Sequence, residues 1–143
     1  MKILRLFAFS LISALMCAAL AAPAIAAKKQ KAPATATVIA KDGIAKMNIV
    51  LQDGAGEVEK HAALELSEHL NKMCGGTFST IEEKQAGKQP GIFIGDTKSG
   101  KKIIKDAELK KLGTEGFVIR TAGKDIFIRG GSPRGTMYGV YSL

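Results

Sequence analysis

A hairpin and a helix are predicted near the C-terminus, where the chain reads Gly116-Phe-Val-Ile-Arg-Thr-Ala-Gly-Lys-Asp-Ile-Phe-Ile-Arg-Gly-Gly-Ser-Pro-Arg-Gly-Thr-Met-Tyr-Gly-Val-Tyr141. Two runs rich in β-branched and aromatic residues, 116–121 and 126–130, flank a turn at 122–125, a pattern typical of a β-hairpin. Ser132 and Pro133 follow, and serine at the N-cap with proline at the first helical position marks a helix start. We therefore expect a hairpin that leads directly into a helix.

Two glycines within that helix indicate how it packs. Gly135 and Gly139 lie four residues apart and so share one face. Glycine destabilises a helix interior by about 1 kcal/mol relative to alanine, so a compensating reason is expected. Close approach of this face to the sheet is the simplest one.

Further strands are predicted upstream of the hairpin. The run Gly-Ile-Phe-Ile-Gly at 91–95 is wholly apolar except for its glycines, which predicts a central strand buried on both faces. Further strands are predicted at 37–40, 47–51 and 78–82, the first two separated by a turn at Asp42-Gly43. A lysine-rich segment, 98–112, has apolar residues spaced for one surface helix, which Gly113 ends.

The strongest helical pattern covers Glu57–Cys74. Its first turn is acidic and Lys72 lies in its last turn, as the helix dipole favours. Gly75-Gly76 provides a C-cap. The predicted buried face comprises Val58, Ala62, Ala63, Leu66, Leu70 and Met73.

The N-terminus, residues 1–26, is predicted to be a secretory signal peptide. Lys2 and Arg5 precede an apolar run at 6–20, and cleavage is expected after Ala26. The apolar core of about 15 residues is shorter than the roughly 20 that span a bilayer, so no stable membrane span is expected. A membrane anchor and a lipoprotein signal acylated at Cys17 remain the alternatives. We therefore expect a secreted or periplasmic protein.

The mature chain is long enough for one domain of about 117 residues. Residues 27–46 are predicted to form a flexible Lys/Ala/Pro/Thr-rich tether followed by the first strand, and residues 47–143 an α+β domain. Only Cys74 survives signal cleavage. The domain therefore has no internal disulfide and depends on its apolar core.

The positive charge alone does not indicate nucleic-acid binding. The whole chain carries a formal net charge of +8, and it falls to near +6 once Lys2 and Arg5 are removed. The excess is mostly lysine spread along the chain, Arg120 is the first arginine of the mature sequence, and tryptophan is absent. Nucleic-acid sites favour clustered arginine with aromatic stacking, so we interpret the excess as a solvated surface and expect no nucleic-acid partner.

One candidate metal site, on the long helix, fails on spacing. His61, Glu65 and His69 recur every fourth residue and form one stripe. Three ligands at that spacing span about 12 Å, too far for one ion, and the H-E-x-x-H order is absent. We interpret the stripe as a solvated face and expect no metal or other cofactor.

Two glycine-rich segments resemble nucleotide-binding motifs only in part. Residues 95–102 approach the phosphate-loop pattern, but Lys102 stands where the Mg²⁺-binding hydroxyl is required. Residues 130–135 have the wrong spacing for a dinucleotide fingerprint, and their preceding strand belongs to a hairpin. Neither Ser-His-Asp nor Cys-His catalysis is indicated, and no carboxylate pair is singled out for glycoside hydrolysis.

The hairpin-helix sequence resembles the end of the N-terminal domain of alpha-glucuronidase-type glycoside hydrolases. A similar element closes the noncatalytic domain of bacterial beta-N-acetylhexosaminidases. The resemblance covers roughly 48–143, and its most specific part is Arg134-Gly-Thr-Met-Tyr-Gly-Val-Tyr141. It includes Ala62 to Leu66 of the long helix and the apolar strand at 91–95.

The resemblance implies an α+β fold, with a mixed sheet and helices packed on one face. It also implies that the domain packs against a downstream catalytic (β/α)8 barrel of the same polypeptide, before which this sequence is truncated. The catalytic residues would lie on that barrel, so none is assigned here. The loop around Arg134 is the one element expected near a substrate, and its alternative is an ordinary surface arginine.

We therefore expect a noncatalytic N-terminal domain of an exported glycosidase of polysaccharide breakdown, with xylan or glucuronide substrates as the resemblance implies. The parent would be the hydrolase, and this chain inactive. Carbohydrate would be a partner only indirectly. A stand-alone carbohydrate-binding domain and a structural or interaction domain are the alternatives.

Overall fold

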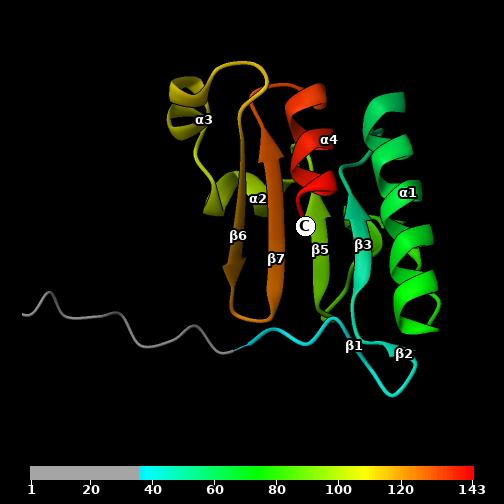
Figure 1. The fold of residues 1–143 in the computed structure, drawn as a ribbon. Coiled ribbons are helices and arrows are strands. Elements are labelled where there is room, and N and C mark those ends of the chain that lie inside the picture. The colour runs from blue at the N-terminus through cyan, green and yellow to red at the C-terminus, as the bar shows by residue number, and fades with distance from the viewer. Residues whose placement is uncertain (1–35) are drawn as a thin grey trace, which may run out of the picture. The chain divides into compact units, whose positions relative to one another are not determined.

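The computed structural model describes residues 36–143, which form a five-stranded mixed sheet (Figure 1). The predicted signal peptide lies outside the described residues. The sheet order is β4-β3-β5-β7-β6; β6 runs antiparallel to β7 and the other neighbours are parallel. The strands are β3 (Asn48–Leu51), β4 (Thr80–Glu82), β5 (Gly91–Ile94), β6 (Phe117–Ala122) and β7 (Asp125–Gly130). The predicted α+β class is confirmed, and β5 is the fully buried central strand.

The helices cover both faces of this sheet (Figure 1). The two longer ones, α1 (Glu57–Cys74) and α4 (Pro133–Tyr141), lie on one face, as the resemblance implied. The two shorter ones, α2 (Lys98–Ile103) and α3 (Asp106–Leu112), lie on the opposite face. There Ile104, between the two helices, and Leu109 of α3 belong to a second core. The segment 98–112, predicted as a surface helix, thus covers the opposite face, whereas the resemblance implied helices on one face only.

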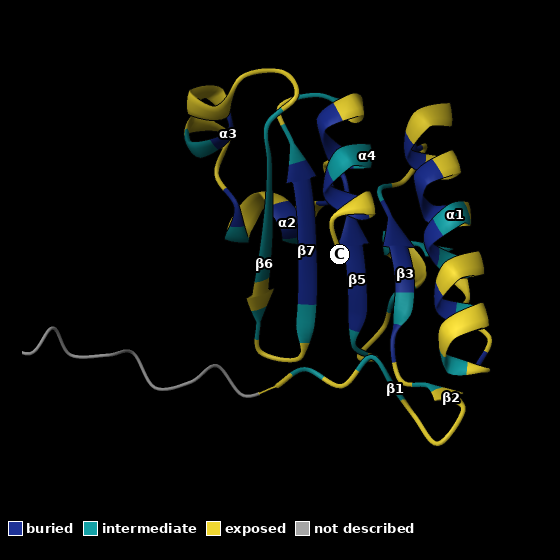
Figure 2. Cartoon of the chain, in the orientation of Figure 1, coloured by how far each residue is buried: buried dark blue, intermediate teal, exposed yellow. Residues whose placement is uncertain are grey.

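Strand alternation creates these two cores. In β7, Ile126 and Ile128 join the core beneath α1 and α4, while Phe127 belongs to the core beneath α2 and α3. Phe127 stacks on Phe93 of β5 with the ring centroids 5.0 Å apart. Figure 2 shows buried residues along β3, β5 and β7 and on the inner sides of the helices.

The prediction of one helix over 98–112 is wrong. The chain breaks between α2 and α3, where Ile104 takes an extended conformation and is completely buried. Arg120 of β6 donates to the Ile103 carbonyl, and Arg129 of β7 donates to the Ile104 carbonyl. These arginines satisfy the backbone acceptors at the end of α2, so the break is stabilised by residues far away in sequence.

The predicted strand at 37–40 is also wrong. The structure has a short hairpin of β1 (Ala40–Lys41) and β2 (Ile44–Ala45), separate from the main sheet. The predicted turn between them is confirmed, since Asp42 and Gly43 both have positive φ, 54° and 73°. The turn is so tight that its flanking residues pair with each other and not with β3.

The long helix matches its prediction in extent but not in every buried residue. It covers Glu57–Cys74, and Gly75 caps it in the left-handed conformation. Val58 and Met73, predicted to be buried, are exposed, Met73 to 79%. A polar residue, Glu59, is buried instead. Within residues 36–143, no helix combines the length and apolar character needed to cross a bilayer.

Candidate functional site

The candidate site is a polar cleft at the carboxyl-terminal ends of the parallel strands β3, β5 and β7. This end of the sheet is called the cleft edge below. From this edge the chain continues into α1 over one face and into α2 over the other. The crevice where connections diverge in this way is the usual ligand position in open α/β sheets. Here a cavity of about 450 Å³ is lined by residues that include Glu59, Asp96, Lys101 and Thr136.

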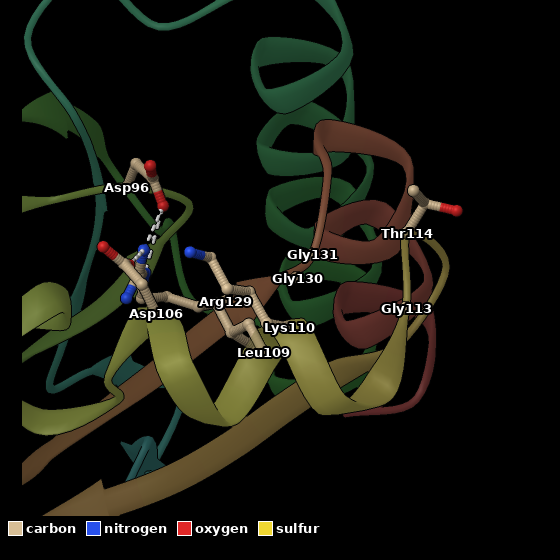
Figure 3. Close-up of a pocket in the computed structure, with 9 residues that line it drawn as sticks. All are labelled: Asp96, Asp106, Leu109, Lys110, Gly113, Thr114, Arg129, Gly130 and Gly131. Carbon is tan, nitrogen blue, oxygen red and sulfur yellow. Dashed lines mark hydrogen bonds and ion pairs between the residues drawn. The ribbon is translucent and has the colours of Figure 1, made fainter.

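A second cavity of about 430 Å³ adjoins the same edge and is lined in part by Arg129 (Figure 3). Arg129 is 2% exposed, and its guanidinium lies between two carboxylates. Nη2 is 2.5 Å from Asp96 Oδ1 and 2.9 Å from Asp106 Oδ1, and Nε donates to Asp96 Oδ1 at 3.1 Å. The buried charge is therefore paired on two sides, as a buried guanidinium requires.

Asp96 also faces Lys101, whose Nζ is 3.1 Å from Oδ2. Partial burial raises the pKa of Asp96, but hydrogen bonds and charge from Arg129 and Lys101 outweigh it and hold the pKa below its usual value. Burial likewise lowers the pKa of Arg129, and the bonds to Asp96 and Asp106 more than reverse that. Both groups are therefore ionised at neutral pH.

Glu59 closes the other side of the cleft from the first turn of α1. Its side chain is 5% exposed, and Oε2 accepts from the Gly56 amide and from Gln52 Nε2, both at 3.1 Å. Its carboxylate lies against Gly95, where an added Cβ would come within 2.5 Å of Oε1. Gly95 also has φ of 78°, so both space and conformation require glycine there.

These carboxylates are arranged to hold loops together. A glycosidase acid needs a raised pKa so that it can protonate a leaving group, whereas Asp96 has a lowered one. Asp106 pairs with Arg129, and Glu59 accepts two hydrogen bonds. The cleft edge can bind polar groups, and its charged residues connect β5, β7, α1 and α3.

Arg134, the residue predicted to lie near a substrate, is on the exposed first turn of α4. Its Nε donates to Tyr138 Oη at 3.0 Å, and its guanidinium lies 5.9 Å from the centre of that ring. Glu115 Oε1 is 3.8 Å from Nη1. The residue adjoins Ser132 and Pro133, which line the cleft, but is not itself among the lining residues. Its proximity to substrate stays a prediction.

The histidine stripe on α1 makes local contacts. His61 Nε2 lies 3.1 Å from Glu65 Oε1, and His69 Nδ1 lies 2.8 Å from the Glu65 carbonyl oxygen. In the described part of the chain, no three His, Cys, Asp or Glu side chains are grouped to hold a metal ion.

The phosphate-loop-like segment is occupied by a carboxylate of the chain itself. Glu83 accepts from the Lys98 amide at 2.6 Å and from the Ser99 amide at 2.8 Å, while Thr97 Oγ1 accepts from the Gly100 amide. These amides begin α2, where a phosphate would otherwise bind. Glu83 therefore takes the anion position.

Sequence reasoning missed Glu59, Asp96 and Arg129. One signal was available: Arg129 lies two residues after Phe127, on the same face of a strand that is apolar from Ile126 to Ile128, so an inward-facing charge was foreseeable. Its partners Asp96 and Asp106 lie in separate segments, where no sequence pattern indicates pairing.

The structure defines a small α+β domain with a mixed sheet and a polar edge. The family model for the glycosyl hydrolase family 67 N-terminus matches residues 25–143, and the chain belongs to that family. The predicted likeness to alpha-glucuronidase N-terminal domains is thereby confirmed.

The comparison with curated proteins gave no match. Among solved structures, the chain is similar to a GH138 enzyme targeting pectin rhamnogalacturonan II, with 20% sequence identity and a TM-score of 0.44. That similarity covers 68% of this chain and 12% of the enzyme.

Proposed function

We propose that this chain is a noncatalytic N-terminal domain of an exported glycoside hydrolase. The domain packs against a downstream (β/α)8 barrel of the same polypeptide, and the enzyme acts in polysaccharide breakdown. The observation that carries the proposal is the family match, because the family is defined as an N-terminal region of glycosyl hydrolases. The paired state of Glu59, Asp96 and Asp106 supports the noncatalytic assignment. The signal-peptide pattern of residues 1–26 supports export, to the periplasm or the medium.

The groove between α1 and α4 is the face proposed for the barrel. Its cavity of about 390 Å³ is lined largely by apolar side chains, among them Leu70, Val140 and Tyr141. Met73 and Tyr141 expose 79% and 54% of their surface at this groove. Exposed apolar area of this kind is typical of an interface.

The coding sequence beyond codon 143 tests the proposal. We expect an in-frame segment of about 250 residues or more with alternating strand and helix patterns. In the longer product, the melting temperature of this domain should rise, because a docked partner stabilises the native state. The double substitution Met73→Ser, Tyr141→Ser should reduce that rise. In a protein of residues 1–143 alone, the same substitutions should change the melting temperature little. A stop codon soon after codon 143 would contradict the proposal.

A further inference from the structure

We propose that the outer surface of α2 and α3 is a binding face for an acidic polysaccharide. This lysine face consists of five exposed residues: Lys98, Lys102, Lys105, Lys110 and Lys111. Four of them lie on α2 and α3 and Lys105 lies between the two helices, which cover the sheet face opposite the α1–α4 groove (Figure 1). A barrel docked at that groove would leave the lysine face open to solvent.

The net positive charge of the described domain is concentrated in this segment. Residues 98–111 hold six lysines and two acidic residues. The other described residues carry ten basic and eleven acidic side chains, so they are close to neutral. The positive charge of the described domain is therefore concentrated in one segment, whereas the sequence analysis interpreted it as spread along the chain.

The acidic residues nearest this patch already have partners: Asp106 and Glu108 pair with strand arginines, and Glu83 accepts from the Lys98 and Ser99 amides. Glu108 accepts from Arg120 at 2.6 Å, and Asp106 accepts from Arg129 at 2.9 Å. Asp96 pairs with Arg129 and Lys101. Within residues 36–143, none of the five face lysines has a carboxylate oxygen within 4.0 Å. Their charges therefore remain available to an external anion.

The patch is also held in place. Arg120 and Arg129 fix the carbonyls at the end of α2, and Glu83 fixes the amides at its start. Ile104 and Leu109 anchor the segment in the core. The lysines thus project from a fixed support, which lowers the entropy cost of binding a polymer.

The chemistry of the face favours a carboxylate-bearing carbohydrate. It contains no aromatic residue between Phe93 and Phe117, so it offers no stacking surface for nucleic-acid bases. Lysine is a hydrated point charge that attracts carboxylate and phosphate alike, so the absence of aromatic residues is what distinguishes this face from a nucleic-acid site. Ile104 and Leu109 face the core. Leu112, 49% exposed, is the one large apolar side chain that these two helices leave exposed, which is too little apolar surface for insertion into a membrane. Given the proposed function, which this inference rests on, the polyanion is a polysaccharide with uronate groups.

The test compares binding of the purified protein to polygalacturonate and to neutral dextran, by calorimetry in about 50 mM NaCl. We expect saturable binding to polygalacturonate alone, weakened by added salt. The five-site variant Lys98→Gln, Lys102→Gln, Lys105→Gln, Lys110→Gln, Lys111→Gln should lose affinity by about tenfold or more.

A matched control removes the same charge elsewhere: Lys41→Gln, Lys46→Gln, Lys72→Gln, Lys88→Gln, Lys124→Gln. It should bind within about threefold of the unmodified protein. Equal losses in the two variants would overturn the proposal, because net charge alone would then explain binding. So would equal binding to dextran, or tighter binding to poly(dT) or to phosphatidylglycerol vesicles. Circular dichroism checks that both variants fold.

The binding test and the test of the proposed function can fail independently. A barrel encoded downstream together with no polygalacturonate binding would overturn this inference alone. Binding by the lysine face with no barrel encoded would support this inference and contradict the docking proposal.

Discussion

Among single residues, Arg129 has the largest set of contacts at the cleft edge. It joins β7 to Asp96, Asp106 and the Ile104 carbonyl while its own side chain is buried. Arg129→Met would leave Asp106 and that carbonyl without this donor, and Asp96 with Lys101 as its remaining partner. Removing one partner of a fully buried pair costs about 3–5 kcal/mol.

Because Asp96 and Asp106 are partly exposed and can be rehydrated, we expect Arg129→Met to lower the free energy of unfolding by about 2 kcal/mol. Urea denaturation measures this. Arg134→Met is the control, since Arg134 is exposed, and should change stability by less than about 0.5 kcal/mol. Equal effects of the two substitutions would show that Arg129 does not hold the break between the helices.

Asp96 should make stability depend on acidity. Its folded pKa is lower than its unfolded pKa, since Arg129 and Lys101 outweigh burial. The stabilisation is therefore complete above the unfolded value of about 3.9 and is lost as the pH falls through the lower folded value. Asp96→Asn should lower the melting temperature at pH 7 and reduce the slope of its fall below about pH 4. If the melting temperatures of the two proteins fall with pH at the same slope across this range, Asp96 does not carry the predicted stabilisation.

Gly139 tests the packing of α4 on the sheet. A Cβ at this position would lie 2.7 Å from Ile128 Cγ2 and 3.2 Å from Phe117 Cδ2. Leucine is the better helix former by about 1 kcal/mol, yet overpacking costs about 1–3 kcal/mol. Gly139→Leu should therefore destabilise the protein in urea denaturation, and Gly139→Ala should do so less. A neutral or stabilising Gly139→Leu would mean that α4 does not dock through its glycine face.

At the scale of elements, sequence patterns predicted what depends on local chemistry. The α1 helix has its predicted bounds because apolar spacing, acidic first turn and C-cap glycine agree. The hairpin of β6 and β7 and the Ser132 N-cap of α4 were predicted for the same reason.

The features that sequence patterns missed depend on distant contacts. The break after α2 is stabilised by arginines from β6 and β7, and the burial of Glu59 depends on Gly95. Arg134, the one residue that the sequence analysis expected near a substrate, does not line the cleft. Glu59, Asp96 and Arg129 come from three separate segments, so no local pattern indicates that they meet.

The start of α2 should not bind nucleotide. Glu83 already accepts from its first amides, and Thr97 Oγ1 accepts from the Gly100 amide. ATP with Mg²⁺ should therefore leave the melting temperature unchanged, because a ligand that binds the native state raises it. Zinc should also have no effect, since the α1 histidines contact Glu65 locally. A saturable rise with either ligand would restore a site that we have rejected.

At the scale of the whole domain, residues 36–143 have two chemically different faces. An apolar groove lies between α1 and α4, and lysines occupy α2 and α3 across the sheet. This division supports a domain that docks through one face and meets a charged polymer through the other. The catalytic carboxylates, in this account, belong to a separate downstream barrel.

The most direct test of this account measures hydrolysis of an aryl glucuronide and an aryl N-acetylglucosaminide by a purified protein of residues 1–143 and, if the coding sequence continues as proposed, by the longer protein. We predict no turnover by the short chain, because its cleft carboxylates are engaged in loop contacts and Asp96 stays ionised. Turnover should require the longer product. Sustained turnover by the short chain, free of contaminating enzyme, would contradict the assignment of a noncatalytic domain.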